Sequence, residues 1–249
     1  MTETADLLGR WAGRAAVRLA HVDSTQNAAR GEAEAGAPEG TVVWADHQTA
    51  GRGRLGRTWT DEPGAALLVS VLLRPGPNVS CLPQISLLAG VAAAEALGAE
   101  SGLPVRLAWP NDLLVGGRKV AGILAESVTS KNAEPVVILG LGVNVNQTRF
   151  PESLAGRATS LALEAGRPFD RERLLRALLV ALEGWYGRWA REGFAPVREA
   201  WRRAAETLGR RVLVEEGLAG IAVDLAEDGA LLVKTDAGLL VRHVAGELV

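Results

Sequence analysis

The 249-residue chain is 48% hydrophobic and 22% charged, which is the composition of an ordinary folded protein and excludes extensive disorder. Its net charge of −2 provides no overall basic field, so nucleic acid is not the expected partner. The single cysteine, Cys81, excludes an internal disulfide and is expected to be buried.

Short apolar runs and polar loops alternate over the first 145 residues. An edge strand is predicted over residues 17–22, and too little chain precedes it for a DNA-reading helix-turn-helix module. The further elements are a helix at 25–35 that Ser24 caps, strands at 41–45, 66–73, 104–109 and 136–145, a helix at 82–99, and a hairpin of 113–115 with 119–126.

The second half of the chain changes from helix to strand. Residues 171–206 have apolar side chains at helical spacing, with a break near Gly193 and Pro196. Four short strands separated by turns follow residue 208, which is typical of a small barrel. We therefore predict an α+β protein with a mixed, mainly antiparallel sheet in domain 1–206 and a second domain at 207–249.

The strongest chemical signal is the sequence GRGRLGRTW over residues 51–59. Its glycines let the backbone approach a ligand, and its arginines form bidentate hydrogen bonds to carboxylates or phosphates. It lacks the GK[ST] ending of a P-loop and the strand and helix that frame a dinucleotide site. By itself, the loop is equally consistent with a solvated basic turn.

Two more segments combine polar residues with apolar strands. WPNDLLVGGRKVAGILAES, over residues 109–127, joins an Asn111-Asp112 turn to a strand that begins near Lys119, whose side chain is also consistent with a lysine that only extends to solvent. GLGVNVN follows at residues 140–146.

Together these motifs resemble the biotin protein ligase family, in its monofunctional form without an N-terminal DNA-binding domain. The resemblance rests on DST at 23–25, HQTAGRGRLGR at 47–57, WPND at 109–112, GRKVAGIL at 117–124 and GLGVNVN, all in the family's order. The C-terminal stretch 208–248 is similar to the family's small SH3-like domain. The resemblance implies a class II synthetase-like catalytic domain followed by an SH3-like β-barrel.

The family resemblance also implies an activity. Biotin and MgATP would form biotinyl-5′-AMP, and biotin would then pass to a lysine of the biotin carboxyl carrier protein of acetyl-CoA carboxylase. Biotin, ATP, Mg²⁺ with the ATP, and the carrier are therefore the expected partners, and a homodimer stays open. No DNA binding or repressor activity is expected.

Residue roles follow from the same resemblance, motif by motif. Arg54 and Lys119 are the expected catalytic residues. The biotin-binding residues would be Ser24, Thr25, Gln26, Gln48, Arg52, Gly53, Arg54, Lys119 and Gly122, and the ATP-binding residues Arg52, Arg54, Arg57, Trp59, Asn111, Asp112, Lys119 and Asn144.

Two positions depart from the family pattern. Gln26 follows DST where many relatives have asparagine, and Ala108 precedes WPND where lysine is common. Arg106, two residues before Ala108 and on the same face of a strand, is our hypothesis for the missing cation.

The sequence also bears on the cellular location of the protein, on metal binding and on alternative functions. The N-terminus lacks a secretory signal and no uninterrupted apolar stretch reaches the roughly 18 residues of a membrane span, so we expect a cytoplasmic protein without a membrane partner. His21, His47 and His243 lie far apart in sequence, and no metal held by the protein itself is expected. A lipoate or octanoate ligase, and a regulator that binds biotin or DNA, are the alternatives.

Overall fold

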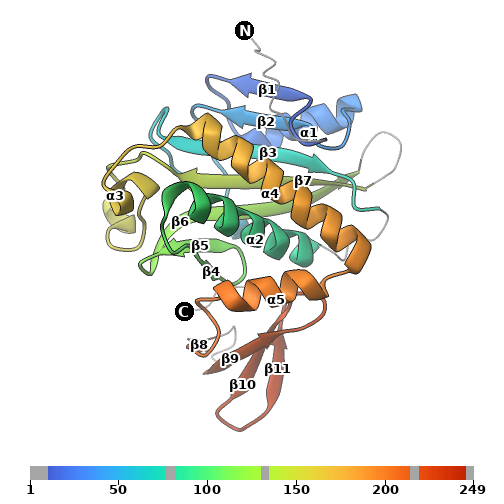
Figure 1. The fold of residues 1–249 in the computed structure, drawn as a ribbon, viewed down its shortest axis with the longest axis vertical. Helices are drawn as coiled ribbons and strands as arrows, with labels where there is room; N and C mark the ends of the chain where they lie inside the picture. The colour runs from blue at the N-terminus through green and yellow to red at the C-terminus, as the bar shows by residue number, and fades with distance from the viewer. Residues whose placement is uncertain (1–10, 77–81, 130–134, 214–218, 245–249) are drawn as a thin grey trace.

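The computed structural model describes residues 11–76, 82–129, 135–213 and 219–244. Figure 1 shows a large sheet with helices packed on it and a separate small sheet near the C-terminus. The predicted α+β class with a mainly antiparallel sheet is confirmed. Cys81 and the turn expected at residues 216 and 217 lie outside the described residues.

The large sheet has seven strands in the order β1-β2-β3-β7-β6-β5-β4. β1 (Ala16–Leu19) pairs parallel with β2 (Val42–Ala45), and every other neighbouring pair is antiparallel. The remaining strands are β3 (Ala66–Leu73), β7 (Pro135–Asn144), β6 (Arg118–Thr129), β5 (Asp112–Val115) and β4 (Arg106–Ala108).

Strand β7 shows how alternation gives the sheet two different faces. Val137, Leu139, Leu141 and Val143 point into the main core, where α2 (Leu82–Ser101) and α4 (Arg171–Glu192) lie side by side. On the other face, Val136 and Ile138 pack against α1 (Thr25–Ala35), and Gly140, Gly142 and Asn144 follow at the same spacing. The second face therefore changes from an apolar contact to open backbone along one strand.

Helix α2 is the one described helix that is long and apolar enough to cross a membrane by length and composition. Its residues are instead packed between the sheet and α4, and Ile85, Leu88 and Leu97 are fully buried. The apolar composition of α2 is therefore explained by its place in the core.

The chain beyond α4 forms the small sheet. The predicted helix break is confirmed, because α4 ends at Glu192 and α5 (Ala195–Ala204) begins with a proline in its first turn. The antiparallel strands are β8 (Arg211–Leu213), β9 (Ala219–Leu225), β10 (Leu231–Thr235) and β11 (Leu240–His243), in the order β11-β10-β9-β8. A domain boundary between residues 206 and 207 stays a prediction.

Candidate active site

A cavity of about 950 Å³ opens on the face of the large sheet that carries α1. This volume lies within the roughly 300–1,000 Å³ that small-molecule sites occupy. It is bounded by the start of α1, the loop 48–60, the turn 109–112, strands β6 and β7, and the loop 150–158. Every biotin-binding and ATP-binding residue that the family resemblance implies lines this cavity, although their motifs are far apart in the chain.

One end of the cavity, the buried end, consists of neutral hydrogen-bonding side chains. The Thr25 backbone N–H donates to Gln48 Oε1 at 2.8 Å, and the Thr25 hydroxyl donates to the same oxygen at 3.1 Å. Ser70 Oγ donates to Thr25 Oγ1 at 2.9 Å and lies within 3.1 Å of Gln26 Oε1. Ser24 caps α1 by accepting from the Gln26 N–H at 3.3 Å, which fixes this helix start against the sheet.

Gln26 closes the buried end. Its Nε2 lies 3.3 Å from the Leu124 carbonyl, 3.3 Å from Glu126 Oε2 and 3.5 Å from the Ile138 carbonyl. A Cβ added to Gly140 would lie 3.1 Å from the Gln26 side chain, so the glycine gives this side chain its room. The departure from the family pattern at position 26 thus places an amide between strands β6 and β7.

The floor of the cavity is bare backbone. Gly122 of β6 pairs with Gly142 of β7, and the Trp59 ring lies over both. A Cβ at Gly142 would lie 2.6 Å from that ring, and one at Gly122 would lie 3.1 Å from it. Trp59 Nε1 is buried and has no hydrogen-bond partner among the described residues. An aromatic ring can occupy this place only because both strands have glycine there.

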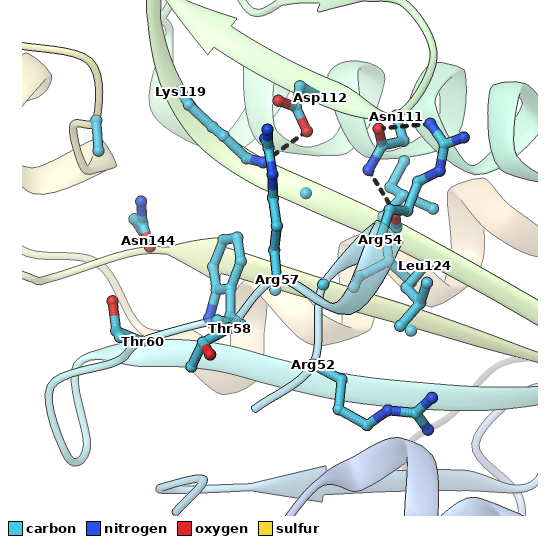
Figure 2. A pocket seen from close by; sticks show the side chains of 18 of the residues that line it. Arg52, Arg54, Arg57, Thr58, Thr60, Asn111, Asp112, Lys119, Leu124 and Asn144 are labelled. Atoms are coloured by element: carbon cyan, nitrogen blue, oxygen red, sulfur yellow. Dashed lines mark hydrogen bonds and ion pairs between the residues drawn. The ribbon is translucent and has the colours of Figure 1, made fainter. Parts of the chain in front are cut away.

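The other end of the cavity, the charged end, brings together the cations predicted to be catalytic. Lys119 Nζ lies 2.7 Å from Asp112 Oδ1, and Arg54 Nη1 donates to Asn111 Oδ1 at 3.2 Å. Figure 2 shows Arg57 extending from the loop toward Lys119 and Asp112. The positive charges of Arg54, Arg57 and Lys119 can neutralise two anions that meet between them.

The glycine and arginine loop is itself ordered into a small hairpin. Arg52 and Thr58 form an isolated antiparallel β-bridge, and the Gly53 N–H donates to the Arg57 carbonyl at 2.7 Å. Leu55 at the tip has a positive φ of 54°. A Cβ at Gly51 would lie 2.5 Å from the Trp59 carbonyl, so this position requires glycine. The glycines were predicted to let the backbone approach a ligand closely. At Gly51, the close approach is instead to the Trp59 carbonyl of the same loop.

Arg52 turns away from the charged end. Its Nη2 lies 2.7 Å from Glu126 Oε1 and its Nη1 donates to Asn27 Oδ1 at 3.3 Å. Figure 2 shows it pointing away from Lys119 and Arg54. In this structure, Arg52 therefore lines the rim rather than the charged end.

The hypothesis that Arg106 replaces the missing lysine is wrong. Its Nη1 and Nη2 donate to the carbonyls of Arg203 and Ala205 at 3.2 and 2.9 Å, and its Nε lies 3.7 Å from Glu206. The last carbonyls of a helix have no partner within the helix, and the end of α5 thus attracts this guanidinium away from the cavity. Arg106 is not among the residues that line the cavity.

Several residues that line the cavity were not predicted from the sequence. The loop 150–158 contributes Phe150, Leu154 and Arg157, and the Arg157 carbonyl accepts from the Lys119 N–H at 2.8 Å. Nothing in TRFPESLAGRA distinguishes this loop from any other polar connection. Ser70, which is bonded to Thr25 and is not itself a lining residue, had one signal in the sequence, since it is the single polar residue of the buried strand ALLVSVLL.

The described residues include no group of three or more His, Cys, Asp or Glu side chains placed to hold a metal ion. Directly before the cavity residue Ser24, the pKa of Asp23 lies below its ordinary value, because the Asn27 side chain and the Ser24 N–H donate hydrogen bonds to its carboxylate. Asp23 is therefore an acceptor that helps to fix the start of α1.

Comparison with known proteins gives the same assignment for both parts of the chain. The model of the Biotin/lipoate A/B protein ligase family matches residues 19–144, and that of the biotin protein ligase C terminal domain matches residues 207–248. The biotin--[acetyl-CoA-carboxylase] ligase of Paracoccus denitrificans is 37% identical over 228 residues, which cover 88% of this chain and 94% of that protein.

Two further similarities extend over most of the chain. The bifunctional ligase/repressor BirA of Bacillus spizizenii is 37% identical over 223 residues, covering 88% of this chain and 69% of that protein. The structure of biotin protein ligase from Aquifex aeolicus in complex with biotin and ATP has a TM-score of 0.83 and 34% identity, with 95% of this chain and 98% of that chain covered.

Proposed function

This chain belongs to the biotin protein ligase family and is a biotin ligase, and on that premise we propose how its cavity performs the reaction. The biotin carboxylate attacks the α-phosphorus of MgATP, which breaks the bond to pyrophosphate and forms biotinyl-5′-AMP. The amine of a carrier lysine then attacks the acyl carbon, releases AMP and loses a proton. The observation that supports this proposal is one cavity with a neutral buried end and a cationic end on a shared glycine floor.

The buried end suits the ureido ring of biotin. Ureido N–H groups and a carbonyl need acceptors and donors without a net charge, and Ser24, Thr25 and Gln48 supply both kinds. Thr25 is already bonded to Gln48 and Ser70, and the Ser24 hydroxyl to the Gln26 N–H, so little ordering is needed on binding. Gly122 and Gly53 would let the ring and the acyl chain approach the backbone.

The charged end suits the reacting anions. A carboxylate approaching a triphosphate is repelled unless cations lie between them, and such positioned charges stabilise the transition state. Arg54 and Lys119 would provide this charge at the reacting atoms, with Arg57 toward the phosphates. Arg52 would reach the phosphates only after its guanidinium leaves Glu126 and Asn27. Trp59, Asn111, Asp112 and Asn144 would line the nucleotide side, and the Mg²⁺ would arrive as MgATP.

Acid-dependent pyrophosphate release tests the first step and separates biotin from lipoate and octanoate. Wild-type protein with MgATP should release pyrophosphate with biotin and not with the other two acids. Release with lipoate or octanoate alone would contradict the proposal. Mass detection of biotinyl-5′-AMP in the same mixture identifies the product.

The second step and the partners need separate tests. Incubation with biotin, MgATP and an apo carrier domain of acetyl-CoA carboxylase should produce a biotinylated carrier on an avidin blot. We further propose that the protein is cytoplasmic. We also propose that it has no repressor activity, because a net charge of −2 provides no overall attraction to DNA. Salt-sensitive specific retardation of promoter DNA would contradict the second of these.

A further inference from the structure

Trp109 lies between the cavity and the C-terminal sheet formed by β8–β11. Its side chain is 5% exposed, and its indole Nε1 donates to the Gly229 carbonyl at 3.1 Å. Its backbone N–H donates to Thr207 Oγ1 at 2.9 Å, and its ring centre lies 5.3 Å from that of His243. Trp109 is thus held from three sides by residues that follow α5.

The residues directly after Trp109 hold the two cations of the charged end. Asn111 is fixed to β6, because its carbonyl accepts from the Ile123 N–H at 2.9 Å and its Nδ2 donates to the Ile123 carbonyl at 2.8 Å. Its Oδ1 accepts from Arg54, and Asp112 pairs with Lys119. One short turn therefore connects the C-terminal sheet to both proposed catalytic residues.

The C-terminal sheet is also attached to the rest of the chain without Trp109. Gln84 Nε2 donates to the Glu227 carbonyl at 2.8 Å, and Arg198 Nη2 lies 2.6 Å from Asp224 Oδ2. A Cβ at Gly229 would lie 2.9 Å from Leu87 of α2. Removal of one hydrogen bond at Trp109 should therefore leave the sheet docked, so its effect on the turn can be measured.

We propose that Trp109 is a positioning residue through which the C-terminal sheet sets the placement of Arg54 and Lys119. The inference rests on the proposed function and deepens it, since it assigns the C-terminal sheet a part in nucleotide binding. Thr207 acts in the same relay, because its hydroxyl accepts from the Trp109 N–H at the point where the turn begins. The buried end, where the ureido ring is proposed to bind, has no hydrogen bond to this turn among the described contacts, so we expect the relay to change MgATP affinity more than biotin affinity.

The test compares Trp109→Phe and Thr207→Val with the wild-type protein. Phenylalanine keeps the ring against His243 and removes the indole donor, and valine keeps the shape of threonine and removes the acceptor. A buried hydrogen bond contributes a modest net free energy, so we expect the Kd for MgATP to rise about 3- to 10-fold in each variant. The Kd for biotin should stay within about twofold, since the buried end is not part of the relay.

Two controls separate positioning from general destabilisation. Trp185→Phe removes another indole donor, whose bond to Glu95 Oε2 is 2.8 Å long and joins α4 to α2 away from the cavity, and should leave the Kd for MgATP unchanged. Thr207→Ser keeps a hydroxyl and should restore MgATP binding. Calorimetry gives both Kd values, and thermal unfolding verifies that each variant is folded.

The relay is overturned if folded Trp109→Phe and Thr207→Val bind MgATP like wild type, or if both Kd values rise together. These measurements do not depend on turnover. A wild-type protein that binds biotin and MgATP but releases no pyrophosphate would contradict the proposed reaction and still give a result for the relay.

Discussion

The two ends of the cavity are constructed in opposite ways. At the buried end, Thr25, Gln48 and Ser70 are neutral, 9% exposed or less, and already bonded to one another. At the charged end, the side chains of Lys119 and Asp112 are 36% and 31% exposed and form an ion pair that an incoming anion must replace. A neutral ring can thus be recognised by a prebuilt site, whereas two anions require cations that exchange partners.

The largest expected effect comes from removing a cation at the charged end. Lys119→Ala should lower the rate of biotinyl-5′-AMP formation by about 100-fold or more, because a preorganised charge at the transition state is lost. The Kd for biotin should change much less than this rate. Lys234→Ala, at an exposed position of β10, is the matched control, and near-normal pyrophosphate release by Lys119→Ala would refute its role.

The floor shared by both ends is the next most sensitive place. Gly142→Ala puts a Cβ within 2.6 Å of the Trp59 ring, so the ring must move and the floor changes shape. We expect kcat/KM to fall about tenfold or more for biotin and for MgATP together, since overpacking costs about 1–3 kcal/mol. Gly31→Ala has nothing within 4 Å of its new Cβ and should leave both values unchanged. A fall in kcat/KM for only one of the two substrates would show that the floor is not shared.

A smaller and more selective effect is expected at the buried end. Thr25→Val removes the hydroxyl that connects Gln48 and Ser70, and the unsatisfied partners cost about 1–3 kcal/mol. The Kd for biotin should rise about tenfold, and that for MgATP should not change. Thr41→Val also removes a buried hydroxyl, bonded to the Pro38 carbonyl, and should lower stability without weakening biotin binding. A matching loss of MgATP affinity in Thr25→Val would remove the distinction between the ends.

The smallest effect concerns Asp23, an exposed residue directly before the N-cap of α1. Hydrogen bonds from Asn27 and Ser24 lower its pKa in the folded protein, so the carboxylate stabilises the fold above its unfolded pKa of about 4. This stability is lost as the pH falls through the lower folded pKa. Asp23→Asn should therefore reduce the free energy of unfolding at pH 7 by less than about 1 kcal/mol, since the site is exposed. Urea denaturation should show the difference between variant and wild type disappear in acid, and a difference that grows on acidification would contradict this cause.

The same contrast between the ends explains what the sequence could predict. The glycines and arginines at 51–57 and the GLGVNVN motif at 140–146 are local patterns, and both contain residues that line the cavity. Ser70, Trp109 and the loop 150–158 gain their importance from contacts with residues far along the chain, which periodicity does not contain. Arg106 and Ala108 lie two residues apart on β4, as the hypothesis required, but the carbonyls at the end of α5 bind the Arg106 guanidinium, and only the packed fold reveals that contact.

A crystal structure with bound biotinyl-5′-AMP is the most direct test of a cavity divided into a neutral and a cationic end. We expect the ureido ring beside Thr25 and Gln48, the phosphate between Arg54 and Lys119, and the Lys119 amine displaced from Asp112. A ureido ring located at the charged end, or an adenylate phosphate that neither Arg54 nor Lys119 contacts, would contradict it.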